Sequence, residues 1–302
     1  MNDAPPAMLP RQTLGYLRNL LQSRRISPKN KLGQNFLIDL NMLDLVVRSA
    51  ELSKDDLVLE VGSGTGTLTG RLAELAGAVV SVEIDPSFHQ LTKELLINRS
   101  NVHLIHGDAL KHKNELNPGM LAKLDEMQAQ FHCTRRKLVA NLPYVIATPV
   151  ICNALIADLG FSLFVVMVQW EIAERLVAEA GSHEYSSLAV LVRSVADVEI
   201  VRRLPPDVFW PRPKVDSAVV KIIPNSAKRA RVPDLQKFRV FLRNLYSHRR
   251  KNLRGALIGW PSGHREKPDV DRKLAEIGID GSVRAETLDI DQHLKLCETF
   301  GI

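Results

Sequence analysis

Short apolar runs alternate with amphipathic segments along the first half of the chain. Five such runs, rich in β-branched residues, are Leu57–Val61, Ala78–Val82, Val102–Ile105, Lys137–Ala140 and Phe161–Val168. Continuous apolar runs of this length are typical of strands that are buried on both faces. The segments between them have helical periodicity, so we expect an α/β fold with a mainly parallel sheet between two layers of helices.

Two longer apolar segments follow these strands. Leu188–Val201 and Val215–Ile223 are predicted to be strands, separated by the proline-rich segment 205–214. Such a pair suggests a hairpin extension at the edge of the sheet, which brings the expected number of strands to seven.

Shifts in composition divide the chain into three parts. Residues 1–30 form an N-terminal extension, residues 31–224 the α/β domain and residues 225–302 a small all-α domain. The last part follows a polar, basic linker, and its first helix is marked by one apolar stripe. The stripe consists of Leu235, Phe238, Leu242 and Leu245.

Candidate chemistry follows four of the predicted strands. Gly62-Ser-Gly-Thr-Gly66, Glu83 and Asn141 each come directly after an apolar run, and the third run ends at Gly107-Asp108. The carboxyl ends of parallel strands share one edge of a sheet, where ligands bind. Glycines let a backbone approach a ligand, Glu83 could accept hydrogen bonds from a ribose diol, and Asp108 could accept one from an adenine amine.

The segment Asn141-Leu-Pro-Tyr144 combines an amide oxygen, the Leu142 carbonyl and a flat ring. Together these groups can accept hydrogen bonds from an exocyclic amine while the ring stacks on its base. The alternative is a turn in which Asn141 caps the next helix and Tyr144 packs on the core. These four residues leave both interpretations open.

The other motifs also have simpler alternatives. The glycine loop fits a dehydrogenase or a tight turn without a ligand, and Glu83 and Asp108 could be solvated acids. A G-x-G-x-G spacing and the lack of an acid–base pair for hydride transfer disfavour a dinucleotide enzyme. The sequence has no HExxH, clustered Cys/His or G-x-S-x-G motif, so we predict no metal site.

Charge is distributed unevenly. The chain of 302 residues carries a net charge of +6, but Lys228–Arg254 alone holds ten basic residues and one acid, Asp234. This segment therefore carries +9 and the remainder −3, and we expect a polyanion to dock there. The densest part is Arg249-Arg-Lys251.

Cysteine usage and hydropathy indicate the compartment. Cys133, Cys152 and Cys297 are odd in number and widely spaced, as expected for reduced thiols in a cytoplasmic protein. The longest apolar run, Phe161–Val168, is too short to cross a bilayer, so we expect no membrane partner.

A set of motifs, in this order, is specific to one known group. They are Gln34-Asn-Phe-Leu37, Glu60-Val-Gly-Ser-Gly-Thr-Gly66, Val82-Glu-Ile-Asp85, Gly107-Asp-Ala-Leu110, Asn141-Leu-Pro-Tyr144, Met167-Val-Gln169 with Glu171, Phe209-Trp-Pro-Arg-Pro-Lys-Val-Asp-Ser-Ala-Val-Val220 and Arg249-Arg-Lys251. From about Lys31 to about Leu296 the chain resembles the KsgA-type (RsmA family) small-subunit ribosomal RNA adenine dimethyltransferases.

The resemblance implies a Rossmann-like class I methyltransferase that uses S-adenosylmethionine. Its substrate would be 16S ribosomal RNA in the 30S subunit or its precursor, with a role in subunit biogenesis. Two adjacent adenosines in the 3′-terminal hairpin loop would each be methylated twice at N6. We also expect a monomer.

The resemblance also implies roles for the residues that bind the cofactor. Asn35 and Leu37 would close over its methionine part, and Gly62 would contact that part from the glycine loop. Glu83 would hold the ribose hydroxyls and Asp108 the adenine amine.

A second group of residues would bind the RNA. Asn141, also a cofactor contact, would hold the target amine together with the Leu142 carbonyl, and Tyr144 and Phe209 would sandwich the target base. Arg249, Arg250 and Lys251 would contact the RNA backbone.

The chain departs from the family pattern at three positions. Ser63 replaces the usual proline, Trp170 the usual lysine and Val145 the common asparagine. Two other functions remain open: an Erm-like methyltransferase acting on large-subunit RNA, and a ribosome-assembly or transcription factor that needs no catalysis.

Overall fold

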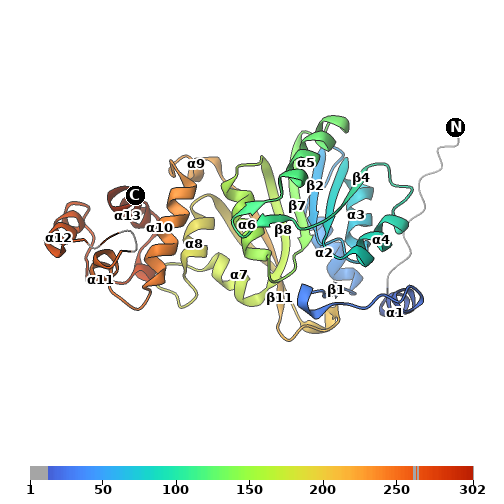
Figure 1. Ribbon diagram of the computed structural model, residues 1–302, viewed down its shortest axis with the longest axis horizontal. Coiled ribbons are helices and arrows are strands. Elements are labelled where there is room, and N and C mark those ends of the chain that lie inside the picture. Colours follow the sequence, from blue (N-terminus) through green and yellow to red (C-terminus); the bar gives the residue numbers. More distant parts are fainter. Residues whose placement is uncertain (1–12, 261–262, 264, 302) are drawn as a thin grey trace. The chain divides into compact units, whose positions relative to one another are not determined.

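The computed structural model describes residues 13–260, 263 and 265–301 (Figure 1). The chain divides into two compact units. The first holds the described residues through Trp170 together with Glu199–Ile223, and the second holds Glu171–Val198 and the chain from Pro224 onward. Part of the predicted N-terminal extension, residues 1–12, lies outside the described residues.

A seven-stranded sheet is the centre of the first unit. Its strands are β2 Asp56–Val61, β3 Ala78–Glu83, β4 Val102–His106, β7 Arg135–Asn141, β8 Phe161–Gln169, β9 Ala196–Leu204 and β11 Ser217–Pro224. They lie in the order β4-β3-β2-β7-β8-β11-β9. The four pairings from β4 to β8 are parallel and β11 is antiparallel to β8, so the predicted mainly parallel, seven-stranded sheet is confirmed.

The described residues of the first unit include six α-helices. They are α1 Leu14–Ser23, α2 Leu40–Ser49, α3 Thr67–Leu75, α4 Pro86–Leu95, α5 Pro118–Gln130 and α6 Ala147–Ile156. Helix α4 has a capped start, because the Asp85 side chain accepts a hydrogen bond from the Ser87 amide and Pro86 occupies the first turn.

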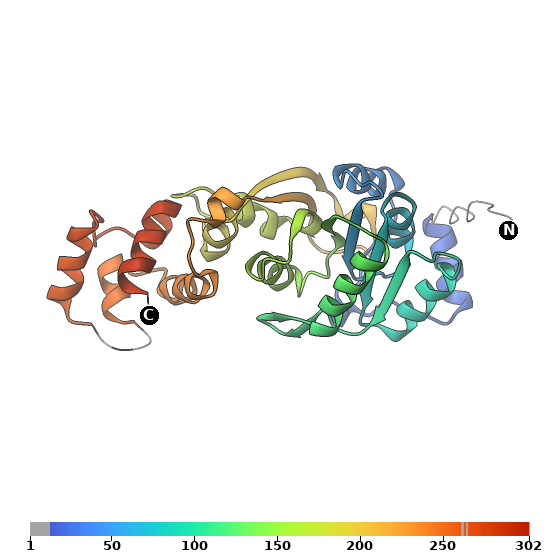
Figure 2. The same ribbon diagram turned by 90° about the horizontal axis from the view of Figure 1, so that it is seen from above.

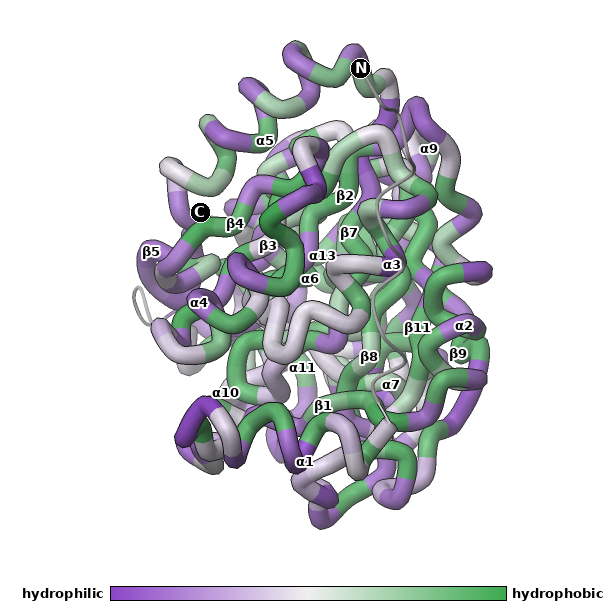
Figure 3. The backbone as a smooth tube through the Cα atoms, turned by 90° about the vertical axis from the view of Figure 1, so that its right-hand side faces the viewer, coloured by the Kyte–Doolittle hydropathy of each residue, from purple (hydrophilic) through white to green (hydrophobic). Residues whose placement is uncertain are grey.

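Both faces of the sheet are buried. Val58 pairs with Val79, and Val139 with Val165, and these four valines share one core cluster with α2 and α3. Figure 2 shows α2 and α3 on one side of the strands and the green helices α5 and α6 on the other. In Figure 3 the strands β2, β3, β7 and β8 are mainly hydrophobic along their length, as burial on both faces requires.

Two short ladders were not predicted. Strand β1 Phe36–Leu37 pairs antiparallel with β10 Phe209–Trp210, and β5 Leu110–His112 pairs with β6 Glu115–Leu116. The first ladder brings the segment before α2 against the proline-rich segment, which also contains the 3₁₀ turn Pro206–Val208.

One predicted strand is wrong in its first half. Within Leu188–Val201, residues Ser187–Arg193 form the helix α8, and only the part from Ala196 is in a strand. Four consecutive residues of α8, Ala189–Val192, are buried, so the helix has no polar stripe at helical spacing. A short, uniformly apolar run cannot be told from a buried strand by its periodicity.

The second unit is helical, as predicted for the C-terminal region. Its helices are α7 Trp170–Val177, which begins at the last residue of the first unit, α8 Ser187–Arg193, α9 Ser226–Arg229, α10 Leu235–Ser247, α11 Leu253–Ile258, α12 Lys267–Glu276 and α13 Ile290–Phe300. The predicted stripe of α10 is buried in full. Residues 171–198 group with these helices although the sequence-based boundary was drawn near residue 224, and that three-part division stays a prediction.

Two classes of feature do not occur in the described part of the chain. No helix there combines the length and apolar character that a membrane crossing needs. Nor does any cluster of His, Cys, Asp and Glu side chains within residues 13–260, 263 and 265–301 suit a metal ion.

Candidate active site

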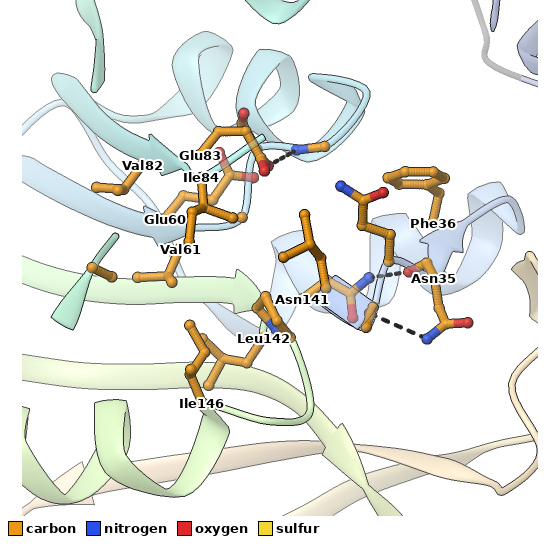
Figure 4. A pocket seen from close by; sticks show the side chains of 18 of the residues that line it. Asn35, Phe36, Glu60, Val61, Val82, Glu83, Ile84, Asn141, Leu142 and Ile146 are labelled. Carbon is orange, nitrogen blue, oxygen red and sulfur yellow. Dashed lines mark hydrogen bonds between the residues drawn. The ribbon is translucent and has the colours of Figure 1, made fainter. Parts of the chain in front are cut away.

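One pocket in the first unit collects eight of the nine predicted catalytic and cofactor-binding residues (Figure 4). It lies where β2, β3, β4 and β7 end, because parallel pairing brings their carboxyl ends to the same edge. The predicted residues that line it are Asn35, Leu37, Gly62, Glu83, Asp108, Asn141, Leu142 and Tyr144.

The glycine loop forms one wall and requires its glycines. Gly62 and Gly64 have φ values of +90° and +51°, which side chains rarely allow. A Cβ on Gly64 would lie 2.9 Å from the Phe36 ring, and one on Gly62 would lie 3.4 Å from Pro143. The loop therefore exposes backbone to the pocket, and Phe36 is packed directly over it.

Glu83 is held rigidly at the end of β3. Its Oε2 accepts a hydrogen bond from the Gly64 amide and its Oε1 from the Asp85 amide, each at 2.9 Å. Burial raises the pKa of this carboxyl, although both amides counteract the rise. Since each carboxylate oxygen has a second lone pair, Glu83 can still accept hydrogen bonds from two hydroxyls of a ligand.

Glu60 also lines the pocket, although no role is predicted for it from the sequence. It is 1% exposed, and its Oε2 accepts hydrogen bonds from Thr69 and Ser81, both at 2.6 Å. Its Oε1 is buried and has no partner among the described residues. Burial raises the pKa of Glu60 to about 7. The available signal was a lone acid inside the otherwise apolar run Leu57–Val61.

Asp108 lies at the exposed end of the pocket. Its Oδ1 accepts a hydrogen bond from the Leu110 amide at 2.9 Å, and its carbonyl oxygen accepts one from Asn117 Nδ2 at 2.9 Å. These two bonds fix the turn after β4 and leave Oδ2 available to a donor such as an exocyclic amine.

Asn141 is oriented by the segment that contains Asn35. Its Nδ2 donates a 2.7 Å hydrogen bond to the Asn35 carbonyl oxygen (Figure 4). That bond determines which atom of the amide is the donor, so Oδ1 is the atom left to accept a hydrogen bond from a ligand. The Leu142 amide donates to Met167 O at 3.2 Å, which holds the following backbone on β8.

The alternative reading of Asn141 as a helix cap does not describe this structure. Helix α6 begins at Ala147 after Ile146, and no side chain caps it. Tyr144 is partly buried, and its hydroxyl lies 2.7 Å from Ser217 Oγ. Burial raises the pKa of this phenol, so Tyr144 presents a neutral ring beside the pocket.

The segment of residues 29–37, here called the N-terminal strap, covers the glycine loop. Lys29 and Gln34 both contact the buried Asp85 carboxylate, at 2.9 Å and 3.2 Å. Burial alone would raise the pKa of Asp85, but these contacts and the Ser87 amide hold it below its usual value. The Phe36 ring packs 4.8 Å from the Phe88 ring, which anchors the strap to α4.

Phe209 lies outside the pocket. It is 2% exposed and packs in the core cluster that contains Leu37 and Val208. The ladder β1–β10 pairs it with Leu37, so it supports the strap from behind. Its predicted role as a second stacking ring stays a prediction.

The predicted RNA-contacting residues are in the second unit, and they lie after the end of α10, not on the helix. Arg249 donates a hydrogen bond to His183 O at 2.6 Å and approaches Glu286 at 3.6 Å. Arg250 and Lys251 are exposed, and the described residues include no ion-pair partner for either. These two side chains are therefore available to a polyanion, whereas Arg249 is partly structural.

Comparison with known proteins identifies the group that this chain is similar to. The model of the family "Ribosomal RNA adenine dimethylase" matches residues 26–300. The ribosomal RNA small subunit methyltransferase A of Clostridium botulinum is 40% identical over 267 residues, which cover 88% of this chain and 92% of that protein.

Solved structures give the same result for the fold. A dimethyladenosine transferase from Plasmodium falciparum superimposes with a TM-score of 0.70 at 27% identity, covering 87% of this chain and 96% of that one. The 23S rRNA methyltransferase ErmE superimposes with a TM-score of 0.59 at 24% identity, and covers 88% of this chain and 99% of that one. The second likeness concerns the fold alone.

Proposed function

The chain belongs to the ribosomal RNA adenine dimethylase family, and from this premise we propose that it dimethylates small-subunit ribosomal RNA. It is a methyltransferase that takes its methyl groups from S-adenosylmethionine. The proposed acceptors are the N6 amines of two adjacent adenosines in the 3′-terminal hairpin loop of 16S RNA.

The orientation of Asn141 is the observation that best supports this chemistry. The hydrogen bond from Nδ2 to Asn35 O leaves Oδ1 as an acceptor at the edge of the pocket. A fixed acceptor favours a methyl-accepting group that carries N–H donors, such as an exocyclic amine, over a group that can only accept hydrogen bonds, such as a carbonyl oxygen. Because the amide is already oriented, no free energy is spent on reorienting it when the substrate reacts.

The site has to overcome the low nucleophilicity of adenine N6, whose lone pair is delocalised into the ring. Asn141 Oδ1 and the Leu142 carbonyl oxygen would accept the two N6 hydrogens. This favours a pyramidal nitrogen and aims its lone pair into the pocket, a gain from orientation and electrostatics. A strong general base is not required, because the proton can leave after the methyl group is transferred.

The target base must leave its stack to reach Asn141. Such extrusion costs a few kcal/mol and is least costly in a loop. Stacking on Tyr144 would recover roughly 1–3 kcal/mol of it. The hydrogen bond between the Tyr144 hydroxyl and Ser217 holds the ring in place for this contact.

The residues of the pocket suit S-adenosylmethionine. When bound, it supplies an electrophilic methyl group on a sulfonium centre. Glu83 would accept hydrogen bonds from the ribose hydroxyls and Asp108 one from the adenine amine, while Asn35, Leu37 and Gly62 would surround the methionine part. The unpartnered Oε1 of Glu60 offers a buried acceptor to the cationic half of the molecule.

The partner and the compartment are parts of the same proposal. We place the reaction on 16S RNA within the 30S subunit or its precursor, in the cytoplasm, with a role in subunit biogenesis and with the enzyme acting as a monomer. The exposed cations Arg250 and Lys251 would contact the RNA backbone.

A methyl-transfer assay with labelled S-adenosylmethionine tests the proposal. Unmodified small subunits, mature small subunits and large subunits serve as parallel substrates, followed by primer extension to map the modified positions. Label at two adjacent adenosines of unmodified small subunits is the expected result. Label on large-subunit RNA would favour an Erm-like function, and no label on any substrate would favour an assembly factor.

A further inference from the structure

An aromatic and a cationic side chain are stacked beside the proposed site. The Arg203 guanidinium lies over the Trp170 ring, 4.4 Å from its centroid. Arg203 Nε also donates a 2.7 Å hydrogen bond to Asp216 Oδ2, and the Trp170 amide donates to Asp216 O at 2.9 Å. Trp170, Arg203 and Asp216, here called the rim cluster, all belong to the first unit.

The strand register places the rim cluster close to Tyr144. Gln169, the residue before Trp170, is paired with Ser217, and Ser217 Oγ lies 2.7 Å from the Tyr144 hydroxyl. Asp216 directly precedes Ser217. With Cα atoms about 3.8 Å apart along the chain, the backbone of Trp170 lies within about 10 Å of that hydroxyl. The rim cluster is therefore close enough to Tyr144 to contact a nucleotide that flanks a base stacked on that ring.

The rim cluster is open to solvent. The Arg203 side chain is 57% exposed, and the described residues include no partner for its two terminal nitrogens. Trp170 is partly exposed. Two further apolar side chains, Val145 at 75% and Val215 at 46%, are also exposed on the segments next to Tyr144 and Asp216.

These side chains have the chemistry of a nucleotide-binding surface. Aromatic rings stack on any base, and a planar guanidinium can bind a phosphate through its remaining N–H donors. Asp216 holds the Arg203 guanidinium in place through Nε, so the guanidinium is already oriented before a ligand binds. An exposed cation–aromatic pair contributes little to folding, which leaves binding as the better explanation for its arrangement.

We propose that Trp170 and Arg203 form a second nucleotide subsite, in which the indole stacks on a base flanking the target adenosine and the guanidinium binds its phosphate. This inference rests on the proposed function, because it takes the ligand to be the RNA substrate. Asp216 is then a positioning residue that acts through Arg203.

Tryptophan fluorescence provides a test that does not require turnover. The titrant is a hairpin oligoribonucleotide with two adjacent adenosines in its loop. Stacking of a base on Trp170 should quench the tryptophan emission. The Trp170→Phe variant should lose that part of the quenching, while its Kd for the oligoribonucleotide stays within a fewfold of the wild-type value. Equal quenching in wild type and Trp170→Phe would overturn the proposal.

Steady-state kinetics on unmodified small subunits separates this subsite from the proposed function. Trp170→Ala should raise KM for the RNA about tenfold, with kcat and cofactor affinity unchanged. Arg203→Gln, on the exposed face of the edge strand, should raise KM and reduce the salt slope of RNA binding by about 0.7. If wild type methylates the RNA and both variants keep its KM, the function stands and the subsite is wrong.

A matched variant controls for the loss of charge. Arg48 is an exposed arginine near the end of α2, and Arg48→Gln should leave KM for the RNA unchanged. If Arg48→Gln raises KM as much as Arg203→Gln does, the effect comes from net charge alone and the proposed phosphate contact is wrong.

Discussion

The two units of this protein each bury an ionisable group, and they treat it in opposite ways. In the first unit, Glu60 is 1% exposed, and its Oε1 has no hydrogen-bond partner among the described residues. In the second, His293 is fully buried, with Nδ1 2.7 Å from Asp289 O and Nε2 3.3 Å from the Tyr246 hydroxyl. Because Glu60 also lines the pocket, its free oxygen is available to a ligand there, whereas both ring nitrogens of His293 have partners and the side chain is a structural contact.

The distribution of charge separates the two units in the same way. Acids and an amide converge on the pocket of the first unit, whereas the exposed cations Arg250 and Lys251 lie in the second. Chemistry in the pocket and the RNA contacts of Arg250 and Lys251 should therefore be separable by mutation, and the following experiments attempt to break that separation.

The largest effect is expected for Asn141→Ala. Removal of the oriented Oδ1 should lower kcat roughly 10²–10³-fold, the usual cost of losing one pre-organised partner of the reacting group. Calorimetric titration should show nearly unchanged cofactor affinity, and filter binding should show unchanged RNA affinity. The matched control is Asn41→Ala, an exposed asparagine of α2. Wild-type turnover in Asn141→Ala would refute the role of Asn141.

The buried acid and the buried histidine predict opposite dependences of stability on pH. Burial raises the pKa of Glu60 to about 7. The stability of the folded state that the protonated carboxyl provides is therefore lost as pH rises from about 4.5 to 7. Burial lowers the pKa of His293 to about 4. The stability of the folded state that the neutral imidazole provides is therefore lost as pH falls from about 6.5 to 4. Each slope is at most about 1.4 kcal/mol per pH unit.

Denaturant unfolding of Glu60→Gln and His293→Gln across that pH range measures both contributions. Relative to wild type, Glu60→Gln should become more stable as pH rises, and His293→Gln should become more stable as pH falls. If the stability of both variants, relative to wild type, changed in the same direction with pH, the proposed contrast between Glu60 and His293 would be wrong.

An intermediate effect is expected for Glu83→Ala. Loss of a rigid carboxylate that accepts hydrogen bonds from ligand hydroxyls should weaken cofactor binding by about 10- to 100-fold. The affinity for RNA should not change. Glu126→Ala, on the exposed face of α5, is the matched control, and calorimetry provides the measurement. An unchanged cofactor affinity in Glu83→Ala would show that the ribose hydroxyls do not bind at Glu83.

The smallest effect is expected for the double variant Arg250→Gln/Lys251→Gln. Removal of two phosphate contacts should weaken RNA binding severalfold and reduce the salt slope by about 1.5, while cofactor affinity stays the same. Arg249 is left in place because it also binds His183 O. The charge-matched control is Arg48→Gln/Lys93→Gln, and an equal slope in the two double variants would show that residues 250 and 251 are merely solvated.

Much of the fold and the pocket could be predicted because the ends of the strands can be recognised in the sequence. Glu83, Asp108 and Asn141 each follow an apolar run, and parallel pairing brings such ends together without further information. The same reasoning failed for α8, because a helix buried on all sides has no stripe that separates it from a strand.

Other parts of the site depend on contacts between distant segments. The bond from Asn141 to Asn35 spans 106 residues, and Gln34 reaches Asp85 across 51. Glu60 was read as part of a strand, since nothing in a single sequence shows that one of its oxygens lacks a partner. The burial of Phe209 likewise follows from its pairing with Leu37, a ladder too short to have a pattern of its own.

The structure of the protein bound to S-adenosylmethionine tests the central claim most directly. We predict the ribose hydroxyls within hydrogen-bond distance of Glu83, the adenine amine at Asp108 and the methyl carbon facing Asn141 Oδ1. A cofactor bound away from Gly62–Gly66, or with its methyl group turned from Asn141, would contradict the account.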